Sequence, residues 1–192
     1  ANVTYLDEQI GRLLAELERQ GLADDTLVVY TSDHGELLYD HGLCQKHCFY
    51  ESSVGVPLVM AGPGVPGGAS REHLVGLIDL FPTFAEQFDL PAPDELEGQS
   101  LLPVIAGDAE ADGRTVFSEF YSWGFAERMI RTPGWKYIHS QGQGKQLFDL
   151  LNDPLERTNL ASDPAHAEGV VELSQRLHAD WEMPAPEQIA RG

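Results

Sequence analysis

The sequence predicts an α/β fold in which helices flank a sheet, followed by a small antiparallel sheet with one helix. Helix-like and strand-like segments alternate through the first half of the chain, and this order is typical of α/β layers. From about residue 115 onward, strand-like segments follow one another without intervening helices, which is typical of an antiparallel sheet. We therefore expect two structural units, residues 1–107 and residues 108–192.

The first half begins with a predicted amphipathic helix. Its apolar face follows a helical repeat, made by Leu6, Ile10, Leu13, Leu14 and Leu17. Gly21 is a natural residue for ending this helix. Residues 26–31 and 56–60 are short apolar runs, and because the first lacks polar alternation, we expect a strand covered on both faces, as in a parallel sheet. A further helix is expected over residues 80–88, with Asp79 as its N-cap.

The second half contains four strand-like segments, residues 115–121, 127–132, 135–140 and 146–150. Residues 132–135 read Thr-Pro-Gly-Trp, a type II turn signature, which predicts a hairpin between the middle two strands. The apolar positions of a final helix are Val170, Leu173, Leu177 and Trp181. Residues 91–98 and 107–113 are the predicted linkers.

The composition is acidic, with 31 Asp and Glu residues against 12 Lys and Arg residues and a formal net charge of -19. Nucleic acid is therefore a poor candidate partner, because binding phosphates requires clustered basic residues. No apolar run approaches the roughly 18 residues of a membrane span. We expect a soluble protein, either cytoplasmic or exported, with two free thiols at Cys44 and Cys48, although a short disulfide between them remains an alternative.

A dense polar loop follows the first predicted strand. It contains Asp33, His34, Glu36, Asp40, His41, Lys46 and His47. Asp33 and His34 are a reasonable pair of metal ligands, although an ordinary turn is an alternative explanation for so short a motif. Lys46 is one of only three lysines in the chain, which favours a specific role over solubility. Zinc held by the two cysteines and nearby histidines is a weaker hypothesis, since no second ligand pair completes a tetrahedral set.

Short motifs recur along the whole chain in a fixed order. They are Thr31-Ser32-Asp33-His34-Gly35-Glu36, Asp40-His41-Gly42-Leu43, Lys46-His47, Val56-Pro57-Leu58, Ile78-Asp79-Leu80-Phe81-Pro82-Thr83, Gly98-Gln99-Ser100-Leu101, Lys136-Tyr137-Ile138, Leu147-Phe148-Asp149-Leu150 and Asn152-Asp153-Pro154-Leu155-Glu156-Arg157-Thr158-Asn159-Leu160. Taken together in this order, these segments closely resemble the sulfatase family. The resemblance implies an alkaline phosphatase-like sheet, with residues 1–107 as the C-terminal part of the catalytic α/β domain and residues 108–192 as a C-terminal α+β subdomain.

The resemblance also implies roles for single residues. Asp33 and His34 match two ligands of a divalent cation, with Ca²⁺ as the first choice and Mg²⁺ or Mn²⁺ as alternatives. Lys46 matches a catalytic lysine that contacts the sulfate group, and a compact ammonium charge suits that task. His47 is a weak candidate for substrate binding, because adjacency to Lys46 does not place its ring in the site.

The chain also departs from the family pattern. Tyr39, Gln45 and Gly55 stand where many relatives have Gly, Gly and Arg, which puts the shape of the substrate pocket in doubt. No Cys-x-Pro-x-Arg or Ser-x-Pro-x-Arg motif, the source of the family's formylglycine nucleophile, occurs in these residues. We therefore expect a fragment that is inactive alone, whose partner is the N-terminal half of the catalytic domain.

The leading functional hypothesis is a sulfuric ester hydrolase acting on a sulfated small molecule or saccharide. A phosphonate monoester or phosphodiester hydrolase of the same superfamily is the first alternative. A non-catalytic module that binds a partner is the second. The residues that would contact the alcohol portion of a substrate cannot be assigned from the sequence, so the substrate itself stays open.

Overall fold

The computed structural model describes residues 2–108, 113–122 and 125–179. The first half contains four α-helices and two strands, α1 Asn2–Arg19, β1 Val28–Thr31, α2 Glu51–Val54, β2 Leu58–Ala61, α3 Leu80–Gln87 and α4 Leu102–Ala106. Short 3₁₀ turns lie between them at Ala23–Asp25, Asp40–Gly42 and Leu77–Asp79. The α/β fold class is confirmed, and both strands begin two residues later than the sequence predicts.

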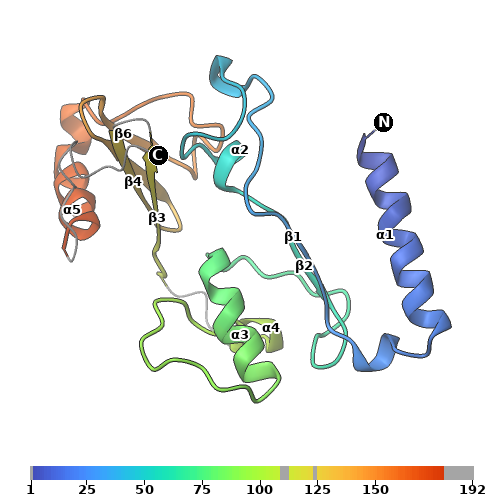
Figure 1. Cartoon of the computed structure of the whole chain (residues 1–192). Coiled ribbons are helices and arrows are strands. Elements are labelled where there is room, and N and C mark those ends of the chain that lie inside the picture. Colours follow the sequence, from blue (N-terminus) through green and yellow to red (C-terminus); the bar gives the residue numbers. More distant parts are fainter. Residues whose placement is uncertain (1, 109–112, 123–124, 180–192) are drawn as a thin grey trace.

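Helix α1 ends where the sequence predicts. Gly21 adopts a φ of +69°, and the N–H of Leu22 donates to the Leu17 carbonyl at 3.1 Å, which closes the last turn. The helix lies to one side of the β1–β2 pair in Figure 1, and none of its residues is buried. Leu13, on its apolar face, is 68% exposed.

Strands β1 and β2 form a two-stranded antiparallel ladder in which Val28 pairs with Ala61 and Thr31 pairs with Leu58. The predicted parallel arrangement is therefore wrong for this pair. The segment between the strands folds back on itself through a loop and α2, so the chain returns in the opposite direction without a crossover helix. The expected cover on both faces is also missing from the described part of the chain, since Tyr30 and Val59 are exposed.

Asp79 directly precedes α3, but its side chain does not cap that helix as predicted. The buried carboxylate instead accepts hydrogen bonds from the N–H groups of Gly76 at 2.7 Å and Gln99 at 2.9 Å, and from Arg114 at 2.6 Å. Asp79 thus ties α3 to the segment before α4 and to the start of the second half. Gly98 permits this close approach, because a Cβ there would lie 2.2 Å from the Ile78 carbonyl oxygen.

The second half contains an antiparallel sheet and a helix, as predicted (Figure 1). Among the described residues, the sheet has four strands in the order β3-β4-β5-β6. Its elements are β3 Val116–Ser122, β4 Phe125–Arg131, β5 Trp135–Ser140, β6 Gly144–Asp149, a 3₁₀ turn Pro164–His166 and α5 Ala167–Leu177. The β4–β5 hairpin is confirmed by the N–H of Thr132, which donates to the Trp135 carbonyl at 2.8 Å. The turn is not type II, because Gly134 lacks the positive φ which that type requires. Trp181, predicted on the last helix, lies outside the described residues.

This sheet is covered on both faces. One cluster joins the sheet to α5, and its buried members are Ile130, Tyr137, Leu147, Val170, Leu173 and Leu177. The second cluster joins the sheet residues Met129, Ile138 and Phe148 to Leu150, just after β6, and to Phe49, just before α2, with Tyr50 and Val54 packed against it. The segment around α2 therefore covers the second face, so the sheet supports the loop that carries the predicted site.

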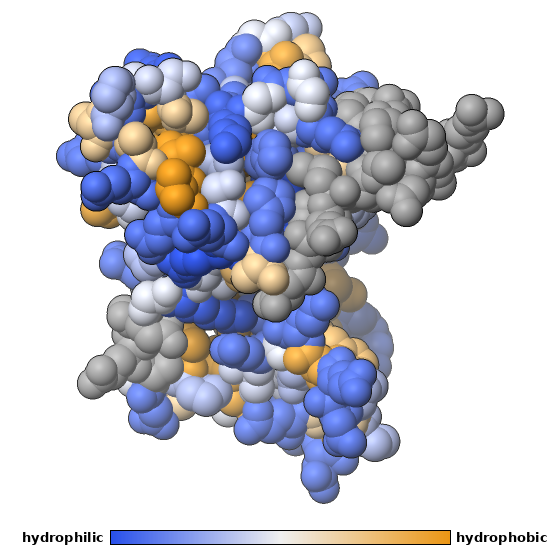
Figure 2. Space-filling view, turned by 90° about the vertical axis from the view of Figure 1, so that its left-hand side faces the viewer, coloured by the Kyte–Doolittle hydropathy of each residue, from blue (hydrophilic) through white to orange (hydrophobic). Residues whose placement is uncertain are grey.

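The surface agrees with the acidic composition. On the face seen in Figure 2, hydrophilic residues cover most of the area and apolar groups form small separate patches. In the part of the chain that the structure describes, no helix is both long and apolar enough to cross a membrane.

Candidate active site at the end of β1

Asp33 and His34 lie just beyond the last residue of β1, at the carboxyl end of that strand, as predicted. The hydroxyl of Ser32 donates to the His34 carbonyl at 2.7 Å, which fixes the turn that presents both side chains. The Asp33 carboxylate is 85% exposed, and its Oδ1 lies 3.6 Å from Nε2 of His34. A carboxylate and an imidazole are thus held side by side at an accessible strand end.

The orientation of the His34 ring is set by its backbone neighbour. Nδ1 lies 2.7 Å from the Gly35 carbonyl oxygen, and since that oxygen only accepts, Nδ1 carries the proton. Nε2 is the ring nitrogen that faces the site, and because an ammonium can only donate, a hydrogen bond from Lys46 requires the lone pair of Nε2 as its acceptor. Nζ of Lys46 lies 2.5 Å from this Nε2, so the loop brings the predicted lysine against the predicted metal ligand across 12 residues.

The geometry of this pair fits a shared cation. Two donor atoms that each lie about 2.3–2.6 Å from one Ca²⁺ are at most about 5 Å apart, and the Asp33–His34 separation of 3.6 Å falls within that limit. A backbone carbonyl that fixes the remaining ring nitrogen is also usual for metal-binding histidines. Among the described residues, no group of three or more His, Cys, Asp or Glu side chains is placed to hold a metal. Because Ca²⁺ takes about 6–8 ligands, a complete Ca²⁺ site would need donors beyond this pair.

The loop between β1 and α2 contains a close backbone contact and residues with positive φ. Gly35 donates its N–H to the Ser53 carbonyl at 2.7 Å, and a Cβ at Gly35 would lie 2.1 Å from the Ser52 carbonyl oxygen, so only glycine fits. Tyr39 and Gln45 adopt φ values of +75° and +70°. Glycine adopts this region without strain, which gives a physical reason for the glycines that the sulfatase pattern places at both positions.

Two serines of α2 hold the loop in place. The Ser52 hydroxyl donates to Oδ2 of Asp40 at 2.5 Å. The buried Ser53 hydroxyl donates to the carbonyl oxygen of Lys46 at 2.6 Å. Helix α2 therefore fixes the backbone of the residue whose side chain reaches His34.

The other two histidines of the loop pack against aromatic rings. His41 stacks on Tyr50, with ring centroids 3.8 Å apart and planes 7° from parallel. His47 lies beside Phe120 of β3 at a centroid distance of 5.7 Å. A substrate contact by His47 stays a prediction.

Both cysteines of the loop are free thiols, as predicted. Burial raises the pKa of the Cys48 thiol above its ordinary value, and the negative charges of Glu127 and Glu156 act in the same direction. The Cys48 thiolate is therefore disfavoured, and thiolate is the form that attacks electrophiles and binds zinc.

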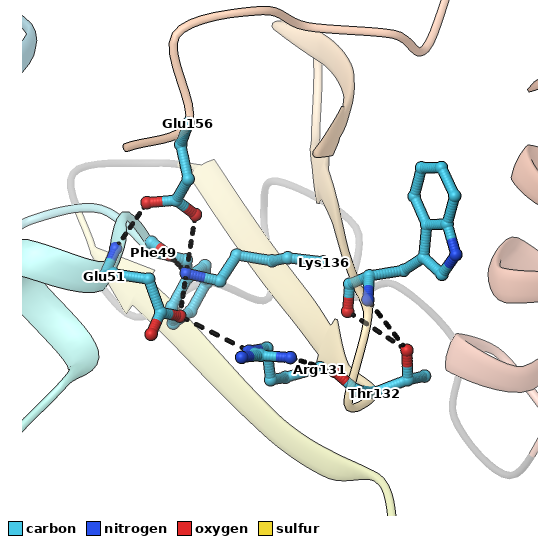
Figure 3. A network of polar contacts seen from close by, with 7 residues as sticks. Phe49, Glu51, Arg131, Thr132, Lys136 and Glu156 are labelled. Atoms are coloured by element: carbon cyan, nitrogen blue, oxygen red, sulfur yellow. Dashed lines mark hydrogen bonds and ion pairs between the residues drawn. The ribbon is translucent and has the colours of Figure 1, made fainter. Parts of the chain in front are cut away.

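The sequence reasoning missed a buried ionic network beside the site, drawn in Figure 3. Lys136 of β5 is fully buried, and its Nζ lies 2.5 Å from Glu51 and 2.7 Å from Glu156. Arg131 extends the network to Glu51 at 3.5 Å. Lys136 and Glu156 both lie in segments that match the family pattern, but the pattern alone contains no signal that they meet.

Comparison with known proteins points to one family. A family profile described as Sulfatase matches residues 1–90. Arylsulfatase K of Homo sapiens is 36% identical over 185 residues, which cover 90% of this chain and 34% of that protein. Choline-sulfatase of Rhizobium meliloti (strain 1021) is 38% identical over 169 residues, which cover 85% of this chain and 32% of that protein. The chain thus spans about a third of the length of these curated relatives.

Solved structures extend the likeness to the fold. A protein in complex with its substrate D-glucosamine-2-N,6-O-disulfate superposes with a TM-score of 0.85 and 31% identity, covering 92% of this chain and 38% of its own. The phosphonate monoester hydrolase of Agrobacterium radiobacter gives a TM-score of 0.83 and 33% identity, covering 92% of this chain and 39% of its own. The chain belongs to the sulfatase family of the alkaline phosphatase-like superfamily.

Proposed function

We propose that this chain is part of a sulfuric ester hydrolase in which Asp33 and His34 supply two ligands of a divalent cation and Lys46 contacts the sulfuryl group. The observation that carries the proposal is the meeting of Lys46 Nζ with His34 Nε2 at 2.5 Å, beside the Asp33 carboxylate. Three residues chosen from the sequence pattern converge at one strand end, where ligand sites of α/β sheets are formed.

The residues of the chain have separate tasks in this proposal. Asp33 and His34 would hold the cation, with Ca²⁺ preferred over Mg²⁺ or Mn²⁺ by family resemblance, and a bound cation lowers the cost of negative charge on the reacting oxygens. Nε2 of His34 offers a single lone pair, so it cannot serve both a cation and Lys46. The Lys46 ammonium is then available to an oxygen of the substrate, where its compact charge stabilises the transferred group.

The nucleophile is proposed to lie outside these residues. No Cys-x-Pro-x-Arg or Ser-x-Pro-x-Arg motif occurs in the chain, so the formylglycine would come from a preceding part of the catalytic domain. We therefore expect no hydrolysis by this chain alone. In the same proposal, residues 1–107 belong to the catalytic domain and residues 108–192 form the C-terminal subdomain.

A sulfate ester of a small molecule or saccharide is the proposed substrate class. Two relatives support it, one a choline-sulfatase and the other solved with a sulfated glucosamine. A phosphonate monoester hydrolase is the second candidate, favoured by the similarity to the enzyme of Agrobacterium radiobacter at 33% identity. The third candidate is a non-catalytic module that binds a partner.

The test is a comparison of kcat/KM on matched aryl esters, one a sulfate and one a phosphonate monoester, using the protein together with its preceding nucleophile segment. A sulfate preference supports the proposal, and a phosphonate preference selects the second candidate. If neither ester is hydrolysed with formylglycine present by mass spectrometry and the metal bound, the enzyme proposal fails and the partner-binding module is favoured.

A further inference from the structure

We propose that the buried ion pair of Lys136 and Glu156 positions the loop that carries Lys46, so that both are positioning residues for the reaction. This inference rests on the proposed function, because it assumes that Lys46 acts on the substrate. It assigns a catalytic consequence to a contact between the small C-terminal sheet and the site at the end of β1. The link runs through α2, which touches both.

The ion pair of Lys136 and Glu156 contacts the start of α2 at several points. The Lys136 ammonium donates to the Phe49 carbonyl at 2.8 Å and lies 2.5 Å from Oε1 of Glu51 and 2.7 Å from Oε1 of Glu156. The contact with the Phe49 carbonyl is a hydrogen bond, while the contacts with Glu51 and Glu156 are ion pairs, and Oε1 of Glu156 accepts no hydrogen bond from the described residues. The second oxygen of Glu156 accepts the backbone N–H of Glu51 at 2.6 Å, across 105 residues of sequence. The side chain of Glu51 is therefore held by Lys136 of the sheet, and its backbone N–H by Glu156 of the turn that follows the sheet (Figure 3).

Helix α2 transmits this placement to the site. With four residues, it is too short to be stable alone, so its position depends on the contacts at its ends. Ser53, in its middle, donates its hydroxyl to the Lys46 carbonyl at 2.6 Å and accepts the N–H of Gly35 at 2.7 Å. One residue of α2 thus binds the backbone of Lys46 and the backbone that follows His34.

Lys136 and Glu156 are themselves held in place by the sheet and by the turn that follows it. Lys136 lies on β5, an inner strand of the four-stranded sheet, and is fully buried. Glu156 lies in a turn with a φ of +53°, and its N–H donates to the Asp153 carbonyl at 3.0 Å. A few residues later, the side-chain oxygen of Asn159 accepts the N–H of Leu147 of β6 at 3.0 Å, which ties this turn to the sheet. A displacement of α2 therefore requires breaking the ion pair or moving the sheet.

The charges of the network are balanced, and its two central members, Lys136 and Glu156, are buried. Lys136 and Arg131 face Glu51 and Glu156, so two cations meet two carboxylates. A Glu156→Gln substitution keeps the size of the side chain but replaces one acceptor oxygen by an NH₂ donor. That donor must face either the Lys136 ammonium or the N–H of Glu51, which are both donors. We expect α2 to shift as a result.

The decisive experiment is a double-mutant cycle between Glu156→Gln and Lys46→Ala, measured as kcat and KM in the protein that contains the nucleophile segment. At a temperature where both variants are fully folded, Glu156→Gln should lower kcat by about 10- to 100-fold, the usual effect of a small misplacement of a catalytic group. In the Lys46→Ala background the same substitution should change kcat by less than about 2-fold, because the group that it misplaces is already absent. Glu172→Gln, the same change on the exposed face of α5, should leave kcat unchanged.

Hydrogen exchange gives a readout that needs no activity. Glu156→Gln should speed exchange of the Gly35 amide, whose acceptor is the Ser53 carbonyl, while the amides of α5 keep their protection. A variant that loosens the whole chain would speed exchange in α5 as well, and that result would overturn the positioning role.

The outcomes separate the two proposals. Normal kcat in Lys46→Ala contradicts the proposed function and, with it, this inference. A large loss in Lys46→Ala combined with an equal loss from Glu156→Gln in both backgrounds leaves the proposed function standing and overturns the positioning role. Should Glu156→Gln fail to fold, Ser53→Ala tests the same link with the ion pair intact. It should lower kcat in the presence of Lys46 and not in its absence, and an unchanged kcat would overturn the inference.

Discussion

Nζ of Lys46 lies 2.5 Å from Nε2 of His34, although the two residues are 12 positions apart. The other two lysines of the chain have different surroundings, since Lys136 is buried in an ion pair and Lys145 is exposed on β6. One lysine in three is therefore placed beside the Asp33–His34 pair. This relationship makes Lys46 the first residue to test.

Lys46→Ala should lower kcat of the intact enzyme by roughly 100- to 1,000-fold, the usual cost of removing one electrostatic donor from a transition state. Lys46→Arg should restore only part of the rate, because a planar guanidinium does not reproduce a compact point charge. The melting temperature should hardly change, since an exposed loop lysine contributes little stability. Lys145→Ala is the matched control, and a near-normal kcat in Lys46→Ala would return Lys46 to the role of a solvated side chain.

Asp33→Ala should remove both the bound cation and the activity of the intact enzyme while leaving the fold unchanged. The fold is expected to survive because the Asp33 side chain is 85% exposed. Elemental analysis of the purified variant measures the metal, with Asp24→Ala as a control on another exposed carboxylate. The chain alone should bind Ca²⁺ only weakly, because Ca²⁺ takes about 6–8 oxygen ligands and this pair supplies two donors. Full metal content in Asp33→Ala would exclude Asp33 as a ligand.

Lys136→Met should lower the free energy of unfolding by about 3–5 kcal/mol, because it leaves the buried carboxylate of Glu156 without its cation. Lys145→Met makes the same change at an exposed position and should stay within about 0.5 kcal/mol of the parent. Urea denaturation of all three proteins measures the difference. A loss below about 1 kcal/mol in Lys136→Met would contradict the strength assigned to this network.

Asp79 predicts a specific dependence of stability on pH. Burial opposes the charged form of Asp79, but hydrogen bonds from Arg114 and from the N–H groups of Gly76 and Gln99 outweigh it, so the pKa lies below its ordinary value of 3.8. The unfolded chain therefore binds this proton at a higher pH than the folded chain. The stability from Asp79 is complete above the unfolded pKa and is lost as pH falls through the folded one.

Urea unfolding between about pH 6 and about pH 2.5 tests this dependence. Asp79→Asn carries no titrating group at this position, so its stability should be lower than that of the parent at the upper end of the range and should fall less steeply on acidification. Parallel curves for the parent and the variant would show that Asp79 contributes nothing to the pH dependence.

Most of the local structure was predictable from the sequence. The leucine repeat predicted α1, and Gly21 ends it because a glycine adopts the required positive φ without strain. The succession of strands after residue 114 predicted the antiparallel sheet, whose order follows the chain. These features depend on residues that are close in sequence, where spacing and backbone preference determine the outcome.

The sequence pattern also selected Asp33, His34 and Lys46, and the fold brings these three together. It did not predict the antiparallel pairing of β1 with β2, because an apolar run reports burial and not the direction of the neighbouring strand. The sequence also did not predict that the carboxylate of Asp79 is buried. Its local position suits a helix cap, while its partners Gln99 and Arg114 lie 20 and 35 residues away.

What the sequence alone determined, then, is the family, the main helices and strands, and which side chains to test. Only the tertiary structure decided that Lys136 and Glu156 meet inside the molecule and hold the start of α2. The physical reason is that a lysine and a glutamate look alike in sequence whether they are solvated or buried. Burial of a charge becomes stable only when distant segments supply its partners, and those segments are brought together by packing of the whole sheet.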